Sequence, residues 1–219
     1  MMNRHKSMSL ADYIFEKLEN DILSGVYPYG EILTESGLSE QLGVSRTPIR
    51  EAIKRLEQEN LVNDVSKGVE VLGITKKDID DIFEIRVRLE GLAARWAAEN
   101  ASPEDKNHLK EVIDLQDFYT GRSDAEHIKD MDSDFHYSLY VCCGSPVLSN
   151  TLIPLHKKVQ QYRKTSVSNG SRAQRSVEEH RAILEAVLAG DGEKADQMMI
   201  EHIRNARESI LSRRKQNWD

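Results

Sequence analysis

The sequence predicts a mainly α-helical protein in two parts: an N-terminal helix-turn-helix with a small β-hairpin wing, and a C-terminal antiparallel bundle of about six helices. Three observations predict this. Apolar residues recur at helical spacing through most of the 219 residues. Two short β-rich runs lie close together before residue 74. Beyond them, glycine, proline and capping residues divide the chain into helical segments with short connections, which is typical of antiparallel neighbours.

The composition is typical of a soluble globular protein with two domains, which we place at residues 8–74 and 75–215. No stretch approaches 18 uninterrupted apolar residues, and the N-terminus lacks the apolar core of a secretory signal, so we expect no membrane span and no export. The chain has two cysteines, Cys142 and Cys143, and they are adjacent. This spacing argues against a disulfide framework and fits a reducing cytoplasm.

The first 74 residues begin with two expected helices. Apolar residues at helical spacing predict a helix over residues 10–25, which Gly25 ends. After a turn, Thr34 is the N-cap of a short helix that continues through Leu42, and Gly43 ends it in the left-handed conformation.

The next helix completes a helix-turn-helix. Ser45 is its expected N-cap, and Pro48 lies in the first turn, where proline is tolerated. A short helix, a turn of about three residues with glycine, and a helix with polar N-terminal residues form the plan of this motif. Two β-rich runs follow, at residues 61–65 and 69–72, and residues 66–68 join them as the hairpin of the wing.

From residue 75 onward we expect helices to the end of the chain. Ser102-Pro103 and Ser145-Pro146 are typical helix starts, and short connections imply antiparallel neighbours. The six expected helices are residues 75–100, 103–120, 124–143, 146–168, 172–189 and 192–215.

The net charge of −7 does not by itself favour a nucleic-acid partner, so any DNA-binding charge must be local. Between Val44 and Arg55, four basic residues stand against a single acidic one. Arg46 and Arg50 are four residues apart, so they share the exposed face of the expected helix, and either can contact guanine O6 and N7 bidentately. A capped amphipathic helix with solvated arginines is the alternative interpretation.

The whole N-terminal segment resembles the winged helix-turn-helix of the GntR family of regulators, over about residues 8–74. The resemblance lies in Leu33, Glu35, Leu38, Leu42, the run Val44-Ser45-Arg46-Thr47-Pro48-Ile49-Arg50-Glu51-Ala52, Leu56, Leu61-Val62 and Gly68. The resemblance implies that side chains at the start of the helix capped by Ser45 touch DNA and that the wing-tip glycine, Gly68, approaches the minor groove. Lys67 is the only cation of this modest wing, so we expect the major groove to dominate. The assigned DNA-binding residues are Glu35, Ser45, Arg46, Thr47, Arg50, Lys54, Lys67 and Gly68.

Histidines on expected buried faces indicate a metal site in the bundle. Asp132 and His136 are four residues apart on one helix, and His180 and His202 lie among apolar residues on two others. A single histidine on such a face is usually a core residue, but three with a carboxylate need a common partner, because an unpaired buried charge is costly. A divalent metal would be that partner. The other four histidines, His5, His108, His127 and His156, are expected to be surface residues or caps.

Arg86 allows two interpretations. It shares an apolar helical stripe and can form an intrahelical pair with Glu90, which would contribute only a few tenths of a kcal/mol, on the order of 0.3. Alternatively, its planar guanidinium points into the bundle and binds the carboxylate of an effector.

The C-terminal part resembles the ligand-binding FCD domain of FadR-type regulators, over about residues 75–212. The matching residues are Glu84-Ile85-Arg86, Leu89-Glu90, Asp132, Phe135-His136, Glu179-His180 and His202. The resemblance implies one divalent metal per chain (Zn, Ni or Mn), held by Asp132, His136, His180 and His202, with a small organic acid beside it. At the position of Ser145, members of this family often have asparagine instead. Six helices instead of seven indicate the shorter, VanR-like branch.

We therefore expect a cytoplasmic homodimer that regulates transcription, is not an enzyme, and binds an inverted repeat in operator double-stranded DNA with an affinity set by a small carboxylate near the metal. Two alternatives remain at this point. One is a helical metalloenzyme fused to a DNA-binding module, although no nucleophile motif or general base is evident. The other is a constitutive DNA-binding protein whose metal is structural.

Overall fold

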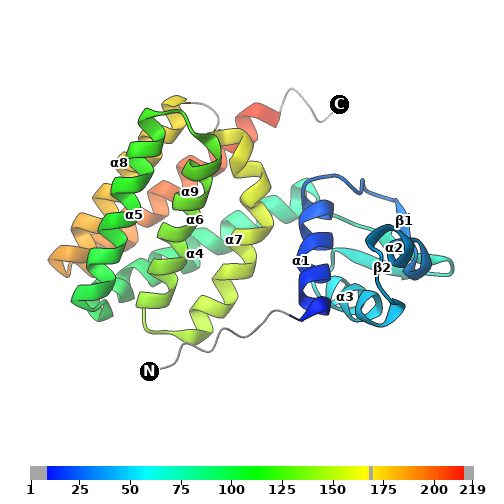
Figure 1. Cartoon of the computed structure of the whole chain (residues 1–219). Coiled ribbons are helices and arrows are strands. Elements are labelled where there is room, and N and C mark those ends of the chain that lie inside the picture. The colour runs from blue at the N-terminus through cyan, green and yellow to red at the C-terminus, as the bar shows by residue number, and fades with distance from the viewer. Residues whose placement is uncertain (1–8, 168–169, 215–219) are drawn as a thin grey trace. The chain divides into compact units, whose positions relative to one another are not determined.

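The computed structural model describes residues 9–167 and 170–214, and it divides into two compact units, the first ending at Lys76 and the second beginning at Lys77 (Figure 1). The expected fold class is confirmed: the chain is mainly helical, with a small antiparallel sheet in the first unit and helices throughout the second.

From residue 9 onward, where the structure describes it, the first unit packs three helices and three short strands around one apolar core. Its elements are α1 (Leu10–Leu23), β1 (Ile32–Leu33), α2 (Glu35–Leu42), α3 (Arg46–Gln58), β2 (Val62–Val65) and β3 (Gly68–Val71). Helix α1 packs against α3, and the buried side chains of both helices join those of the strands in a single cluster. The helix-turn-helix is therefore supported on its buried side by α1 and by the sheet.

The caps of α2 and α3 have the predicted chemistry at two of three positions, Thr34 and Gly43, and not at Ser45. The Thr34 hydroxyl oxygen accepts a hydrogen bond from the Gly37 N–H at 3.0 Å, which caps α2. Gly43 ends that helix with φ +66°, a left-handed conformation that glycine adopts without strain. Ser45 lies at the N-cap of α3, but its side chain makes no capping hydrogen bond there. Its hydroxyl is therefore not committed to the helix start.

The wing contains one strand more than the sequence predicted. Strands β2 and β3 form the expected hairpin, and β1 pairs with β3 to give the order β1-β3-β2. Two residues are too few to show an alternating pattern, so β1 had no sequence signal. A Cβ at Gly68 would lie 2.2 Å from the Leu33 carbonyl oxygen, and φ there is +142°. The glycine is thus required by the approach of β1, whatever its role toward DNA.

The described residues of the second unit form six helices, whose bounds agree with the predicted ones to within two residues. They are α4 (Lys76–Asn100), α5 (Pro103–Gly121), α6 (Ala125–Cys142), α7 (Pro146–Val167), α8 (Gly170–Ala189) and α9 (Gly192–Arg214). Helix α5 packs against α6 and α8, α6 packs against α7, and α8 packs against α9 (Figure 1). Helices α6, α8 and α9 contribute the histidines of the centre described below, and α4, α5 and α7 contribute residues that contact it or lie beside it.

Local sequence explains where several of these helices begin and how closely they approach. Ser102 and Asp105 form a reciprocal capping box at the start of α5, and Pro103 directly follows Ser102 as the first residue of the helix. A Cβ at Gly91 of α4 would lie 2.1 Å from a carboxylate oxygen of Asp196 on α9. The absent side chain lets α9 approach α4 beside Glu90.

The expectations about membranes and thiols can also be compared with the structure. Among the described residues, none of the helices combines the length and the apolar character that crossing a bilayer requires. Cys142 and Cys143 are buried free thiols. Burial raises the pKa of Cys142 to about 12, so this thiol stays protonated and unreactive at neutral pH.

Candidate nucleic-acid interface and candidate metal centre

Helix α3 separates an apolar inner face from a polar outer face. Its buried residues are Ile49, Ala52, Ile53 and Leu56. The residues that the sequence assigned to DNA on this segment, Ser45, Arg46, Thr47, Arg50 and Lys54, are all exposed. Because the helix packs on the core through the opposite side, the outer face is available along its N-terminal two turns. Such a face is what a recognition helix presents to the major groove.

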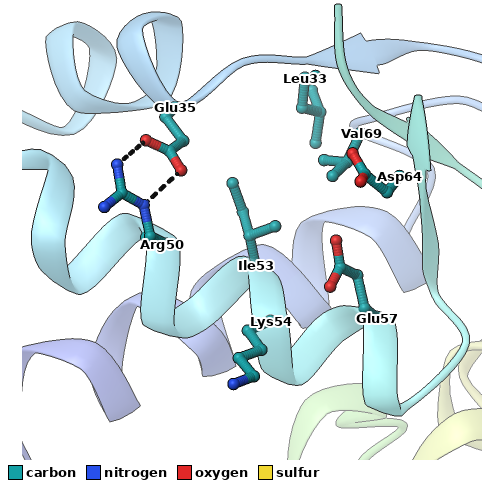
Figure 2. Close-up of a pocket in the computed structure, with 9 residues that line it drawn as sticks. Leu33, Glu35, Arg50, Ile53, Lys54, Glu57, Asp64 and Val69 are labelled. Atoms are coloured by element: carbon teal, nitrogen blue, oxygen red, sulfur yellow. Dashed lines mark hydrogen bonds and ion pairs between the residues drawn. The ribbon is translucent and has the colours of Figure 1, made fainter. Parts of the chain in front are cut away.

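Glu35 in the first turn of α2 holds Arg50 of α3. Its two carboxylate oxygens accept hydrogen bonds from Nε and Nη2 of Arg50, each at 2.8 Å (Figure 2). The hydrogen bond from Arg50 lowers the pKa of Glu35, and the carboxylate in turn raises the pKa of Arg50. Both side chains are substantially exposed, so the pair adds little stability. Its main effect is to orient the guanidinium and to leave Nη1 directed away from the carboxylate.

A pocket of about 340 Å³ lies between α3 and the wing, beside this ion pair (Figure 2). Its lining residues are Leu33, Glu35, Arg50, Ile53, Lys54, Glu57, Asp64, Gly68 and Val69. Three carboxylates, those of Glu35, Glu57 and Asp64, line it against two cations, Arg50 and Lys54, so its net charge does not favour phosphate. The candidate DNA contacts are therefore the exposed cationic side chains of α3, two of which, Arg50 and Lys54, also line this pocket, and not the cavity itself.

The four predicted metal-ligating residues come together in the second unit. His136 of α6, His180 of α8 and His202 of α9 are fully buried, and one ring nitrogen of each lies within 4.8 Å of the others. The Nε2 atom of His202 is 3.2 Å from Nε2 of His136 and 3.4 Å from Nε2 of His180. Asp132 is 2% exposed, and its Oδ1 lies 3.8 Å from Nε2 of His180.

The opposite nitrogen of each ring contacts an oxygen acceptor. The Nδ1 atom of His136 is 2.9 Å from Oε2 of Glu90, that of His180 is 2.8 Å from Oε1 of Gln116, and that of His202 is 2.7 Å from Oε2 of Glu179. A carboxylate or amide oxygen can only accept, so each Nδ1 must carry the hydrogen and each Nε2 carries a lone pair. Three inward lone pairs repel one another unless a cation lies between them. Neutral imidazoles fixed by outer acceptors, with one carboxylate, are a donor set that suits Zn, Ni or Mn.

Arg86 and Glu90 form a buried ion pair next to this centre. Both side chains are 0% exposed, and Nε of Arg86 donates to Oε1 of Glu90. Burial alone would raise the pKa of Glu90, but the charge of Arg86 and the hydrogen bonds from His136 and Arg86 lower it, so the carboxylate is ionised. Nη1 of Arg86 is buried and has no hydrogen-bond partner among the described residues. The intrahelical pair and a free donor for a ligand therefore coexist in one side chain.

His156 was predicted as a surface residue or cap, and this prediction is wrong. The side chain is 0% exposed, and its Nδ1 lies 3.4 Å from both Nη2 of Arg86 and the Tyr140 hydroxyl. The sequence contained a pattern that indicates burial, because His156 is spaced to share one helical face with Leu152 and Val159. In the structure all three side chains are fully buried.

The same prediction, a surface residue or a cap, was made for three other histidines. His127 is exposed and contacts the N-cap residue Asp124, as expected, and His108 is also exposed. His5 lies outside the described residues.

His156 belongs to a second group of three ligand atoms, with Glu90 and His136, that lie within 4.8 Å of one another. The guanidinium of Arg86 contacts Glu90 and lies beside His156. Its positive charge already neutralises this group, which therefore needs no metal ion. Of the two groups, the three histidines His136, His180 and His202 are therefore the candidate metal site. Sequence reasoning did not identify Gln116 or Tyr140, and it named Glu179 only as a residue that matches the FCD domain, because the contacts of all three depend on the packing of separate helices.

Comparison with known proteins agrees with both halves of this description. The model of the bacterial regulatory proteins of the gntR family matches residues 10–68, and that of the FCD domain matches residues 81–205. The uncharacterized HTH-type transcriptional regulator YdhC of Bacillus subtilis (strain 168) is 30% identical over 191 residues, which cover 86% of this chain and 85% of that protein. The Uxu operon regulator of Haemophilus influenzae is 30% identical over 221 residues, which cover 90% of this chain and 80% of that protein.

A solved structure agrees in fold. That of McbR/YncC from Escherichia coli has a TM-score of 0.78 at 24% identity, with 94% of this chain and 99% of that one covered. Fold and site together define a class, the winged helix-turn-helix regulators with a helical C-terminal domain. The chain belongs to the GntR family, and its second unit is an FCD domain, the combination found in the FadR-like subfamily. It is a transcription regulator and not an enzyme, which removes the metalloenzyme alternative.

The buried position of His156 can be tested by substitution. His156→Ala should lower the free energy of unfolding by about 2 kcal/mol, because it leaves a cavity and removes a polar neighbour of Arg86. The exposed His108 is the control, and His108→Ala should change stability by less than about 0.5 kcal/mol. Urea unfolding of both variants measures this. Equal stability of the two would place His156 on the surface.

Proposed function

We propose that the protein is a homodimeric regulator that binds an inverted repeat in operator DNA and changes its affinity for that DNA when a small organic acid binds beside a divalent metal in the second unit. The observation that carries the proposal is the convergence of three buried imidazole Nε2 atoms close to an arginine with an unpartnered, buried Nη1. Family membership supports the DNA-binding part.

In the proposed complex, the exposed face of α3 enters the major groove. Arg46 and Arg50 contact base edges, since both are exposed and Arg50 keeps Nη1 directed away from Glu35. Ser45 and Thr47 bind phosphates through hydroxyl and backbone N–H groups at the helix start. These roles suit a helix whose N-cap side chain is not used for capping.

The remaining assigned residues have supporting roles. Lys54 lies farther along the exposed face of α3 and would bind a phosphate. Lys67 is exposed at the tip of the wing, and Gly68 next to it lacks a side chain that would hinder approach to the minor groove. Glu35 would orient Arg50. Because a two-fold dimer presents two such helices, the operator would be an inverted repeat.

In the second unit, Asp132, His136, His180 and His202 would hold the metal. The ion would supply positive charge and coordination positions for oxygen atoms of the acid. An octahedral ion would keep two positions for these atoms, whereas a tetrahedral zinc ion would have its four ligands already. The planar guanidinium of Arg86 would bind the carboxylate through Nη1, the donor that its pair with Glu90 leaves over.

A second function has one observation in its favour. All three histidines are 0% exposed, which suits a metal that only holds α6, α8 and α9 together. In that case the protein would bind DNA constitutively. The two functions differ in one measurable respect: in the first, an acid that binds the metal-loaded protein changes its operator affinity, and in the second no acid does.

The DNA contacts can be tested by substitution on α3. Arg46→Ala and Arg50→Ala should each weaken specific operator binding by roughly 1–3 kcal/mol, because each would remove a contact to a base. Lys54→Ala should cost less and act equally on all sequences, as the loss of a phosphate contact does. Fluorescence anisotropy at matched salt measures these effects. Wild-type affinity in an Arg46→Ala/Arg50→Ala double variant would contradict the assignment.

The metal can be tested on protein purified without chelator and without nickel resin. We expect about one equivalent of a transition metal per chain in the wild type, and a marked loss in His202→Ala together with a lower melting temperature, because ligands on different helices couple metal binding to folding. His108→Ala, an exposed histidine substitution, should keep both values. Less than about a tenth of an equivalent in the wild type, with no rise in melting temperature on adding Zn, Ni or Mn, would contradict a metal role.

A further inference from the structure

Glu90 contacts both halves of the proposed site at once. Its Oε1 accepts a hydrogen bond from Nε of Arg86, and its Oε2 lies 2.9 Å from Nδ1 of His136. All three side chains are 0% exposed, so water does not screen these contacts. One carboxylate therefore joins the arginine that would bind the acid to a histidine that would bind the metal.

A similar chain elsewhere in the centre serves as an internal comparison. Oε2 of Glu179 lies 2.8 Å from Nη1 of Arg172 and 2.7 Å from Nδ1 of His202. Each of these two glutamates thus links an arginine to a metal-binding histidine. The difference is at the arginine, because the buried Nη1 of Arg86 has no hydrogen-bond partner among the described residues. Within the part of the chain that the structure describes, it is on the Glu90 side that the chain of contacts ends at a buried donor with no protein partner.

We infer that Glu90 is a positioning residue that couples acid binding at Arg86 to metal binding at His136, so that each ligand strengthens the binding of the other. This inference rests on the proposed function, because it assumes the metal at the three histidines and the carboxylate at Arg86. It assigns to Glu90 a regulatory role beyond that of a counterion for Arg86.

The direction of the coupling follows from the charges. A carboxylate at Nη1 neutralises part of the guanidinium charge, so Glu90 interacts less with Arg86 and more strongly with the Nδ1–H of His136. A stronger hydrogen bond at Nδ1 makes Nε2 a better donor to the metal. In the reverse direction, a metal at Nε2 polarises the Nδ1–H toward Glu90 and weakens the hold of Glu90 on Arg86. The two effects must be equal in free energy, because linkage between binding sites is reciprocal.

The experiment uses Co²⁺ as the metal probe and acetate as the simplest carboxylate. The full-length chain is freed of metal, and its Co²⁺ affinity is measured from the visible absorption of bound Co²⁺ with and without a high concentration of acetate. The quantity compared is the acetate factor, the ratio of the two Co²⁺ dissociation constants. In the wild type we expect a factor of about five or more, the lower end of the usual range for coupled sites.

Two glutamate variants separate coupling from simple support of the histidines. Glu90→Gln and Glu179→Gln should each weaken Co²⁺ binding by about 10-fold to 100-fold, as the loss of an outer partner of a metal ligand does. Glu179→Gln should keep the acetate factor of the wild type, whereas in Glu90→Gln the factor should fall to below about half of it. Glu90→Asp keeps a charge beside Arg86 if the neutral variant does not fold. Its shorter side chain cannot reach both partners, so its factor should fall as well.

Each outcome decides one of the two claims. Equal acetate factors in wild type, Glu90→Gln and Glu90→Asp, or an equal fall in Glu179→Gln, would overturn the coupling role while leaving the metal and the acid site in place. A wild type that binds Co²⁺ with no response to acetate would also overturn it. A wild type that does not bind Co²⁺ at all would overturn the proposed metal centre itself, and the coupling with it.

Discussion

Three imidazole rings from α6, α8 and α9 direct their Nε2 atoms toward one buried point, and much of the second unit is arranged to make this convergence stable. Because a buried ring nitrogen that carries a hydrogen needs an acceptor, Glu90, Gln116 and Glu179 each lie against one Nδ1. Because a carboxylate that is withdrawn from water needs a cation, Arg86 lies against the buried Glu90 and Arg172 against the partly buried Glu179. The histidines are thus surrounded by two successive sets of polar side chains: the acceptors of the Nδ1 hydrogens, and then the arginines that contact the two glutamates.

The two units use polar contacts for orientation more than for stability. In the first unit, Glu35 fixes the guanidinium of Arg50 at the surface, where an ion pair contributes little free energy but restricts the side chain to one geometry. In the second, Glu90 fixes Arg86 and His136 in the same way within the interior. An arginine that is already oriented loses less conformational entropy when it binds a base or a carboxylate.

The fold could be predicted almost completely from the sequence, because caps and apolar stripes are local. Thr34, Gly43 and Pro103 mark helix ends by their own conformational preferences, and the spacing of Asp132 and His136 places both on one face. What could not be predicted depends on contacts between distant segments. Gln116 meets His180 across 64 residues, and β1 exists only because it pairs with β3. His156 was missed although its helical spacing with Leu152 and Val159 indicated burial.

The account depends most directly on the protonation of the three histidine rings, which long-range ¹H–¹⁵N correlation spectra of metal-free protein can measure at neutral pH. We predict that His136, His180 and His202 each carry their hydrogen on Nδ1, since each Nδ1 faces an oxygen acceptor, and that all three Nε2 signals shift on addition of a diamagnetic metal such as Zn. Exposed His127 provides an internal reference whose signals should not respond to the metal. Hydrogens on Nε2 in two or more of the three rings, with no change on adding metal, would contradict the centre described here.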